Sequence, residues 1–537
     1  MSNWNIADVW ETVAQLIPDA PALTHDSHRV SWRSFDRRAA GVADALAAAG
    51  VGPGSAVALY LRNRPEYLES MFAAFKLSAA PVNTNYRYMA GELKYLWDNA
   101  DVAAVVFAGE FAGRCEEVRP AVPHVRLWLW VDDGSGNCPS WAVPYDEPAQ
   151  AGRDHVAGTR RRSGDDLLLF YTGGTTGAPK GVMWRQDDFG ALINAGARRR
   201  YPEDGGVDDI RALVTGPGPV HLPACPLMHA TGSVTSMGAL WQGGSVVTVP
   251  SRSLNAVELL DTIERERVET LAIAGDAFAR PLVEALDANP RRWDLSSLTY
   301  IISSGVIWSE ETRNRLLDHH PELALVDMFG SSEAVGLGRA VSRRGAPAAA
   351  AQFRLGPGVK VITDDGRLVE PGSGEIGKVA VAGRVPLGYL KDPQRSARTF
   401  PVIDGVRHSV PGDYATVRAD GTLQLLGRGS GVINTAGEKV FPEEVEEALK
   451  SHPAVIDAAV VGVPDDRFGE AVAAMVEPDP GRPVPTEAEL TEHVKARLAG
   501  YKAPRRIVLG PVGRTATGKL DYPDIKARVK EGIDAGA

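Results

Sequence analysis

The sequence predicts an α/β protein with a large N-terminal domain of doubly wound sheets plus a small barrel, followed by a small α+β C-terminal domain. Apolar segments of strand length alternate with amphipathic segments of helical spacing through most of the chain. Short strands separated by Gly-Pro turns replace this alternation from Phe353, and a fresh alternation begins at Pro442. A chain of 537 residues is also too long for one ordinary domain.

The N-terminal third shows the strand and helix alternation most clearly. Residues 31–50 (SWRSFDRRAAGVADALAAAG) have apolar positions at helical spacing and end in Gly50, as a helix with a glycine C-cap does. The apolar run at 55–61 predicts a buried strand, residues 65–80 predict a second amphipathic helix, and residues 102–107 predict another strand. This order favours parallel strands covered by helices.

The C-terminal third predicts a change of architecture. Residues 356–383 (GPGVKVITDDGRLVEPGSGEIGKVAVAG) are typical of short strands in a small barrel or sandwich. Pro442 stands at a first helical position with Glu443 and Glu444 in the first turn, which is favourable helix-start chemistry. We therefore expect an N-terminal domain over 1–427, a hinge at 428–431 and a C-terminal domain over 432–537.

Composition and charge exclude several classes of function. The net charge of -10 argues against a nucleic-acid partner, because phosphate affinity requires a surplus of Lys and Arg. No run of about 18 apolar residues occurs, so we expect no integral membrane contact. Three cysteines without metal spacing fit a reducing compartment, and we expect a cytoplasmic enzyme. Self-association into a homodimer is left open.

A glycine- and threonine-rich segment predicts a phosphate-binding loop. In DDLLLFYTGGTTGAPKGV (165–182) an apolar strand runs into a loop whose glycines let backbone amides approach an oxyanion, while threonine hydroxyls and Lys180 add donors. The segment is not a Walker A loop, because Ala178 and Pro179 separate the last glycine from the lysine. A mobile glycine-rich turn is the alternative interpretation.

This loop closely resembles the signature of the adenylate-forming superfamily of acyl-CoA synthetases, nonribosomal adenylation domains and luciferases. Further segments that resemble family motifs follow in the family's order, so the resemblance covers nearly the whole chain. They are PLMHATG (226–232), SSGVIW (303–308), FGSSE (329–333), PGD (411–413), GRGSGVINTAGEKVFPEEVE (427–446) and TGK (517–519). The resemblance implies ATP, Mg2+ and coenzyme A as cofactors, and a mobile C-terminal domain.

The resemblance also implies site residues. Lys519, Glu333 and His229 are the expected catalytic residues, with Glu333 and Thr172 at the magnesium ion. The residues expected to bind nucleotide or coenzyme A are Thr172, Gly173, Gly174, Thr175, Thr176, Gly177, Lys180, Ser304, Gly305, Asp327, Met328, Phe329, Ser332, Asp413, Arg428 and Gly437. The residues expected to contact the acid are His229, Val234, Met237, Phe278, Val306, Gly330 and Val335. Without the resemblance, Glu333 would read as a solvated loop charge, Asp413 as a turn residue and Lys519 as a surface lysine.

Several positions depart from the family pattern. Phe329 replaces the usual Tyr and Ser332 the usual Thr, Ser430 stands at a hinge position that is commonly Asp or Lys, and Ala436 stands where a basic residue often precedes Gly437. No acidic residue lies between Pro226 and Gly243, which disfavours an α-amino acid substrate. The segments GVMWRQ, GDAFARPLVEAL and GEKVFPEEVE are most similar to a subgroup of acyl-CoA synthetases that act on steroid side-chain acids and other bulky polycyclic acids.

We therefore interpret the chain as an ATP-dependent, AMP-forming acyl-CoA ligase that activates a bulky hydrophobic carboxylic acid. Three alternatives stay open at this point. The acyl group could be loaded onto a carrier protein, the chain could thioesterify a preformed acyl-adenylate only, or it could be a nucleotide-sensing scaffold without turnover.

Overall fold

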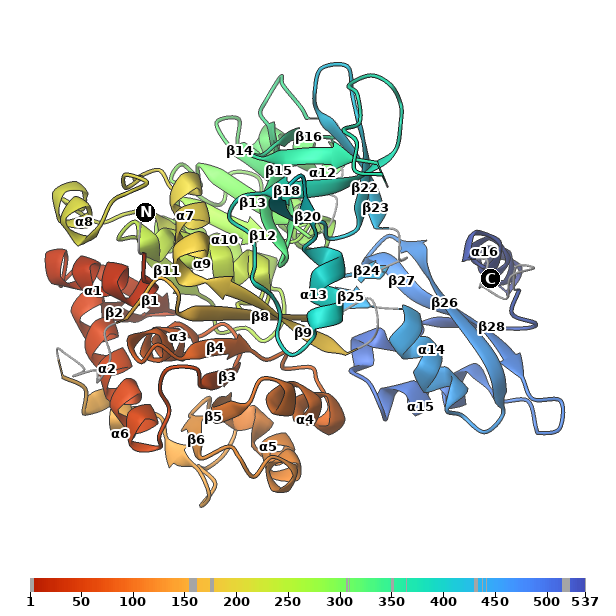
Figure 1. Ribbon diagram of the computed structural model, residues 1–537, viewed down its shortest axis with the longest axis horizontal. Helices are drawn as coiled ribbons and strands as arrows, with labels where there is room; N and C mark the ends of the chain where they lie inside the picture. Colours follow the sequence, from red (N-terminus) through yellow and green to blue (C-terminus); the bar gives the residue numbers. More distant parts are fainter. Residues whose placement is uncertain are drawn as a thin grey trace. The chain divides into compact units, whose positions relative to one another are not determined.

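The computed structural model describes residues 4–153, 162–173, 178–305, 308, 310–348, 352–363, 365–428, 433–436, 438–440, 442–513 and 522–536. The chain divides into two compact units (Figure 1). The first comprises Met1–Tyr86, Leu96–Tyr171 and Gly181–Leu426, and the second comprises Arg87–Tyr95, Thr172–Lys180 and Gly427–Ala537. The second unit thus includes two short segments from within the predicted N-terminal domain.

One sheet of the first unit carries the strands on both sides of the predicted phosphate loop. Its strand order is β19-β9-β8-β4-β3-β5-β6-β7, and neighbouring strands from β8 to β7 run parallel. The strands are β3 (Ala56–Tyr60), β4 (Ala80–Asn83), β5 (Val102–Ala108), β6 (Leu127–Val131), β7 (Val143–Pro144), β8 (Leu167–Gly173), β9 (Pro179–Arg185) and β19 (Gly388–Tyr389). The associated helices are α1 (Ile6–Leu16), α2 (Trp32–Ala48), α3 (Pro65–Lys76), α4 (Ala90–Asn99), α5 (Ala112–Val118), α6 (Asp146–Gln150), α7 (Gln186–Gly196) and α8 (Val207–Leu213), with 3-10 turns at Gly109–Phe111 and Arg119–Ala121.

A second, longer sheet has a parallel part and an antiparallel part, in the order β2-β1-β11-β10-β12-β13-β14-β15-β16-β23-β22-β18-β21-β20. Its parallel part contains β1 (Pro21–His25), β10 (Val220–Pro223), β11 (Ser245–Thr248), β12 (Thr270–Ile273), β13 (Tyr300–Ser304) and β14 (Ala324–Ser331), with the hairpin strand β2 (His28–Ser31) at its edge. Its helices are α9 (Ala230–Trp241), α10 (Ala256–Arg265), α11 (Asp276–Ala288) and α12 (Glu310–His319).

Antiparallel strands continue this sheet from β14 onward, over the region where the sequence predicts short strands. They are β15 (Ala334–Ser342), β16 (Gln352–Leu355), β17 (Val359–Ile362), β18 (Gly377–Ala382), β20 (Val402–Ile403), β21 (Val406–Ser409), β22 (Asp413–Val417) and β23 (Leu423–Arg428), with α13 (Pro393–Thr399) between β19 and β20. Their buried side chains form one apolar cluster that includes Phe329, Leu337, Phe353 and Val379.

The second unit is a small α+β fold. Its sheet has the order β25-β24-β27-β26, with β28 beside β27, and is built from β24 (Ile433–Thr435), β25 (Glu438–Val440), β26 (Val455–Asp465), β27 (Gly469–Pro478) and β28 (Arg506–Leu509). Its helices are α14 (Pro442–Lys450), α15 (Glu487–Lys495) and α16 (Tyr522–Gly536), with a 3-10 turn at Gly500–Lys502. Within this unit the buried Lys502 ammonium donates to Glu92 at 2.8 Å and to Glu444 at 2.7 Å. Burial opposes the charge on Lys502, but the two glutamates outweigh it and hold its pKa above the ordinary value.

The predicted fold class is confirmed: an α/β protein with a large N-terminal domain of sheets and helices and a smaller C-terminal domain. The predicted helix at 31–50 is α2, whose N-cap Ser31 accepts from Ser34 N, and whose last turn closes through Gly50 at φ 76. The predicted helix over 65–80 was too long, because Ser78 at φ 55 leaves helical geometry and β4 begins at Ala80. No helix among the described residues is long and apolar enough to cross a membrane.

Candidate active site

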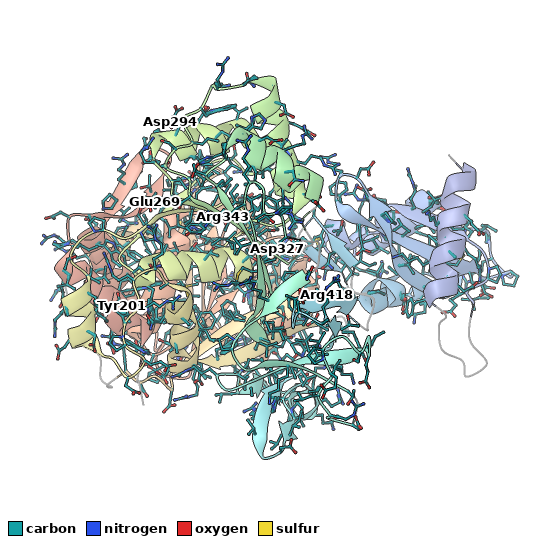
Figure 2. All side chains as sticks on the ribbon, turned by 90° about the horizontal axis from the view of Figure 1, so that it is seen from above. Tyr201, Glu269, Asp294, Asp327, Arg343 and Arg418 are labelled. Carbon is teal, nitrogen blue, oxygen red and sulfur yellow. The ribbon has the colours of Figure 1, made fainter. Side chains whose placement is uncertain are left out.

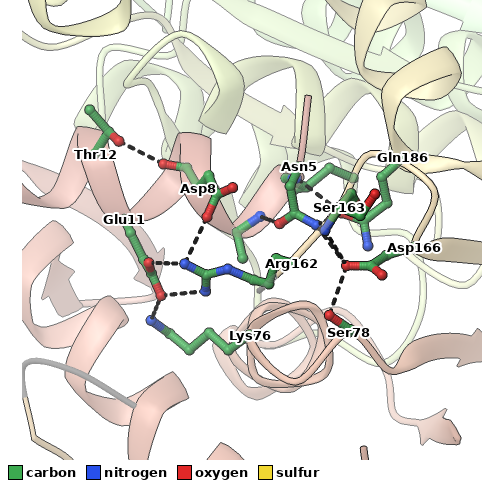
Figure 3. A network of polar contacts seen from close by, with 12 residues as sticks. Asn5, Asp8, Glu11, Thr12, Lys76, Ser78, Arg162, Ser163, Asp166 and Gln186 are labelled. Carbon is green, nitrogen blue, oxygen red and sulfur yellow. Dashed lines mark hydrogen bonds and ion pairs between the residues drawn. The ribbon is translucent and has the colours of Figure 1, made fainter. Parts of the chain in front are cut away.

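Charged and polar side chains fix the base of the strand that leads into the predicted phosphate loop (Figure 3). Asp166 immediately precedes β8, and its Oδ2 accepts hydrogen bonds from Asn5 Nδ2 at 3.1 Å, Ser78 Oγ at 2.7 Å and Ser163 N at 3.0 Å. The N-terminal segment also reaches the end of β9, because Ile6 N donates to the Gln186 side chain at 3.0 Å. The beginning of β8 and the end of β9 are therefore held by the same N-terminal segment.

Ion pairs extend this base into a buried network, which is also drawn in Figure 3. Arg162 contacts Asp8 at 2.7 Å and Glu11 at 2.8 Å, and Lys76 contacts Glu11 at 2.7 Å and Asp36 at 2.6 Å. Burial by itself would raise the pKa of Glu11, but the hydrogen bonds and charges of Arg162 and Lys76 lower it to about 2. Glu11 is thus held as a carboxylate.

At the other end of the same strands, Tyr171 and Gly181 pack together. A Cβ added to Gly181 would come within 2.7 Å of the Tyr171 ring, so the glycine after Lys180 makes room for that ring. Thr172 and Gly173 end β8, and Lys180 lies in β9. The predicted loop residues Gly174, Thr175, Thr176 and Gly177 lie outside the described residues.

The predicted adenine-side residues end two neighbouring parallel strands. Ser304 on β13 lies beside Met328 on β14, and Gly305 follows at φ 89 in the left-handed region that favours glycine. Because carboxyl ends of parallel strands form the usual ligand-binding edge of an α/β sheet, this register supports the sequence interpretation. Val306 lies outside the described residues.

Asp327 is a buried acid on β14, and Figure 2 shows it within the first unit. Burial raises its pKa to about 7, and the charge of the buried Arg313 only partly opposes that rise. Arg313 uses its donors elsewhere, to Ser342 Oγ at 3.4 Å and Ala348 O at 2.9 Å. The residues predicted to bind nucleotide thus include an acid whose pKa burial raises well above its ordinary value.

Glu333, the residue expected at the magnesium ion, lies in the turn from β14 to β15 and is held there by hydrogen bonds. The Glu333 carboxylate is buried and accepts from Tyr389 Oη at 2.8 Å, and its main-chain oxygen accepts from Ser409 Oγ at 2.7 Å. The preceding Ser332 oxygen accepts from Trp184 Nε1 at 2.8 Å. Magnesium is usually held by one or two protein carboxylates together with substrate phosphates and water, so a fixed carboxylate fits this role.

Phe329 and Asp413 occupy two different settings. The Phe329 ring lies 5.4 Å from that of Phe353 inside the apolar cluster, so the ring expected at adenine also belongs to the core. Asp413 begins β22 as a buried side chain directly after Gly412, which has φ 96. The backbone of Arg428 ends β23, while its side chain, Gly437 and Lys519 lie outside the described residues.

The predicted acyl-side residues come from the segment before α9 and from neighbouring elements. His229 is the N-cap residue of α9, and a Cβ on Gly232 would lie 2.5 Å from Pro226 O, so the first helical turn rests directly on this segment. The remaining predicted residues are Val234 and Met237 on α9, Phe278 on α11, Gly330 on β14 and Val335 on β15. Met237 is fully buried, and Phe278 packs against the core cluster of the second sheet.

Comparison with known proteins decides the family. Residues 10–390 match the AMP-binding enzyme family, and residues 444–519 match the AMP-binding enzyme C-terminal domain. The chain belongs to the AMP-binding enzyme family. It is 40% identical over 529 residues to 3-oxocholest-4-en-26-oate--CoA ligase of Rhodococcus rhodochrous, covering 96% of this chain and 94% of the relative. It is 32% identical over 529 residues to feruloyl-CoA synthase of Amycolatopsis sp, covering 96% and 97%.

The fold of this AMP-binding enzyme is similar to that of solved relatives. Amide bond synthetase McbA from Marinactinospora thermotolerans superposes with a TM-score of 0.81 at 26% identity, covering 97% of this chain and 99% of McbA. As its family and its curated relatives show, the enzyme is an ATP-dependent, AMP-forming acyl-CoA ligase that uses ATP, Mg2+ and coenzyme A. The resemblance stated from the sequence motifs is thereby confirmed.

Sequence reasoning missed three residues that organise the site of this AMP-binding enzyme. Tyr389 holds the Glu333 carboxylate, and Asn63 and Asn83 hold the segment that leads to His229. A polar residue at or shortly after the carboxyl end of a buried strand is the signal that could have found the two asparagines, because such residues lie near the ligand edge of a parallel sheet.

Proposed function

We propose that this acyl-CoA ligase acts on a bulky hydrophobic acid of the steroid side-chain type. The carboxylate attacks the α-phosphorus of ATP and releases pyrophosphate, and the thiol of coenzyme A then attacks the acyl carbon and releases AMP. The observation that carries the substrate class is the 40% identity, over 96% of the chain, to a ligase named for 3-oxocholest-4-en-26-oate. The absence of an acidic residue from Pro226 to Gly243 is consistent with an acid that lacks an amino group.

The acyl side offers apolar surface from two helices. Val234 is half-buried on α9 and Phe278 is half-buried on α11, and neither brings a charge to the acid. Each methylene transferred from water to apolar surroundings contributes about 0.8 kcal/mol. A fused-ring or long-chain acid therefore gains far more from such a lining than acetate does.

Individual residues take the following proposed roles. Glu333 with Thr172 holds magnesium, which lowers the negative charge that the attacking carboxylate meets at the phosphates. Lys519 stabilises the charge of the first transition state, Asp413 and Arg428 bind the ribose, and His229 borders the acyl group. Gly437 gives the pantetheine arm of coenzyme A room to enter.

Three further features of the sequence interpretation stay proposals. The functional domains are 1–427 and 432–537, joined by a hinge at 428–431 that lets the C-terminal domain serve both half-reactions. The enzyme acts in the cytoplasm. It self-associates as a homodimer, which light scattering on the purified protein tests directly.

The test is acid-dependent exchange of pyrophosphate into ATP, followed by thioester formation, with a panel of a C26 steroid acid, palmitate, ferulate and acetate. We expect the steroid acid to give the highest kcat/KM. Preference for acetate would contradict the large apolar acid. Glu333→Gln serves as the inactive control, because its amide keeps the shape of the carboxylate but loses the charge.

The same assay separates the possible acceptors. Labelled acyl group is offered to coenzyme A and to a phosphopantetheine-bearing carrier protein in parallel, and transfer to coenzyme A is expected. Exchange of pyrophosphate by the wild-type enzyme contradicts both a thioesterification-only enzyme and a scaffold without turnover.

A further inference from the structure

Two asparagine side chains join the two sheets of the first unit at their carboxyl edges. Asn83 is the last residue of β4, and Asn63 lies just beyond the end of the neighbouring parallel strand β3. The segment they hold, residues 223–228, leaves β10 of the other sheet and leads to His229. Carboxyl edges of parallel strands are where α/β proteins bind ligands.

Among the described residues, the Asn63 side chain makes its hydrogen bonds to this segment. Its Nδ2 donates to Pro223 O and to Cys225 O, both at 3.0 Å, and its Oδ1 accepts from Leu227 N at 2.7 Å. The Asn63 carboxamide therefore supplies hydrogen bonds to the backbone of this segment where strand pairing along β10 ends.

Asn83 contacts the same segment and also the strand before the phosphate loop. Its Nδ2 donates to Met228 O at 2.7 Å and to Tyr171 O at 2.8 Å, and its Oδ1 accepts from Tyr171 N at 2.7 Å. Backbone pairing between β4 and β8 is recorded at Val82 and Leu169, so the Asn83 carboxamide continues the ladder to Tyr171. Thr172, the first residue of the predicted phosphate loop, follows Tyr171 directly.

The chemistry of these contacts requires a carboxamide. Each asparagine makes two donations from Nδ2 and one acceptance at Oδ1, which an Asn side chain offers without charge. An aspartate in either place would keep the shape, lose both donors and set a negative charge against two carbonyl oxygens. Neutral groups also add no negative charge to an edge that is expected to receive a phosphate chain and a carboxylate.

We propose that Asn83 is a positioning residue that couples the nucleotide side of the site to the acyl side. One carboxamide fixes both the approach to the phosphate loop and the residue before His229, so ordering of either side by its ligand orders the other. Asn63 holds the acyl side only. The inference assigns the nucleotide to one side of the site and the acid to the other, and this assignment rests on the proposed function.

The matched pair of variants is Asn83→Asp and Asn63→Asp. The two substitutions are isosteric, remove the same number of donors and act on the same segment, and both wild-type side chains are half-buried. Calorimetry measures the Kd of AMP, of the acid that the wild-type enzyme activates best, and of a non-hydrolysable acyl-sulfamoyl adenosine that joins the two. Choosing the acid by activity keeps this test intact if the steroid assignment fails.

Coupling is measured as the association constant of the joined ligand divided by the product of the two separate association constants, and it is compared between variants so that the contribution of the covalent link cancels. Coupled sites typically share enough free energy to change an affinity about tenfold, so we expect this ratio to be about tenfold lower in Asn83→Asp than in the wild-type enzyme. Asn63→Asp should weaken the acid and the joined ligand by the same factor and leave AMP affinity unchanged. Equal coupling in wild-type and Asn83→Asp protein would overturn the proposal, as would equal loss of coupling in both variants.

Thermal unfolding of each variant checks the fold. If Asn83→Asp does not fold, Asn83→Ser is measured instead, because it removes the carboxamide without introducing a charge. Unchanged coupling in that variant also contradicts the proposal. A merely structural role would lower stability and leave the coupling factor unchanged.

Discussion

Two buried carboxylates in the first unit have their pKa shifted in opposite directions. Glu11, at the base of the strands that carry the phosphate loop, lies against Lys76 and Arg162, and its pKa falls to about 2. Asp327, at the predicted nucleotide edge, is buried without a close cationic contact among the described residues, and its pKa rises to about 7. Paired charges at the base of the strands stabilise the fold, whereas ionisation of Asp327 at the predicted site lowers the stability of the fold.

This difference has a physical reason. Charges at the base of the strands need only stabilise the fold, so cations and anions can pair fully there. Groups at the ligand edge must stay available for a substrate, and the cost of burying them is borne by the rest of the fold. The two asparagines at the carboxyl edge of the other sheet follow the second pattern, because they hold the backbone without adding charge.

Removing a cation from the ion-pair network at the base of β8 and β9 should have the largest effect on the unfolding free energy. Lys76→Met removes the ammonium that lies 2.6 Å from Asp36 and 2.7 Å from Glu11 in a buried site, while Glu11 keeps its contact with Arg162. Removing one partner of a buried pair costs about 3 to 5 kcal/mol of unfolding free energy. Urea unfolding measures this loss. Lys360→Met, at an exposed position of β17, is the control, and a similar midpoint in both variants would contradict the buried-pair account.

Removing the buried Asp327 carboxylate, whose charge Arg313 offsets only in part, should act in the opposite direction. A folded-state pKa of about 7 lies above the unfolded value of 3.8, so folded Asp327 binds the extra proton between these limits. Stability from this group is therefore present below pH 3.8 and is lost as pH rises to about 7. At pH 8 Asp327→Asn should be more stable by up to about 4 kcal/mol.

Unfolding of wild type and Asp327→Asn at pH 5 and pH 8 measures this difference. Asp44→Asn on the exposed face of α2 is the control and should change neither value. If Asp327→Asn gains nothing at pH 8 relative to pH 5, the carboxylate of the apo enzyme is not destabilised by burial.

The change in unfolding free energy at low pH should distinguish Glu11 from Asp327 further. Glu11 has a folded pKa of about 2, below its unfolded value of 4.5, so its contribution is present above pH 4.5 and is lost as pH falls toward 2. The shift corresponds to about 3 kcal/mol. Glu11→Gln should be less stable than wild type by that amount at pH 7 and should approach it near pH 2, as followed by urea unfolding at each pH. A constant difference across the window would refute this assignment.

The sequence predicted the fold class and the order of motifs because these depend on local signals. Periodicity, the N-cap Ser31 and the glycine at residue 50 lie within one segment and specify α2 directly. Strand β4 was missed, because it has only four residues and contains Pro81, which weakens a strand pattern. The residue that ends β4 is Asn83, so its contacts with Tyr171 and Met228 were missed together with the strand.

Contacts between distant segments could not be predicted in the same way. Asn83 and Met228 are 145 positions apart, and Tyr389 and Glu333 are 56 positions apart. No periodic or motif signal specifies such partners; only the fold brings them together. The expected roles of Lys519 and Gly437 depend on the motif resemblance, since both residues lie outside the described residues.

Tyr389→Phe should have the smallest of these effects, and it tests whether the site side depends on single hydrogen bonds. Tyr389 lies on β19, whose pairing with β9 joins it to the strand after the phosphate loop, and its hydroxyl is 2.8 Å from Glu333 Oε1. The ring is held independently by Phe400, with centroids 5.6 Å apart, so the phenylalanine should keep its place. Loss of one hydrogen bond to a charged group costs about 1.5 to 3 kcal/mol, which corresponds to about tenfold or more in affinity.

We expect this cost in magnesium-dependent nucleotide binding, because without the Tyr389 hydrogen bond the Glu333 carboxylate is held less firmly in its proposed position at the ion. Calorimetric titration of ATP at several magnesium concentrations measures it, and the half-saturating magnesium concentration should rise about tenfold. Tyr300→Phe, at the amino end of β13 and away from the ligand edge, is the control and should leave magnesium dependence unchanged. If the two variants have the same magnesium dependence, the Tyr389 hydrogen bond is not what positions Glu333, and its other contacts, among them the one from Ser409 Oγ to its main-chain oxygen, are sufficient.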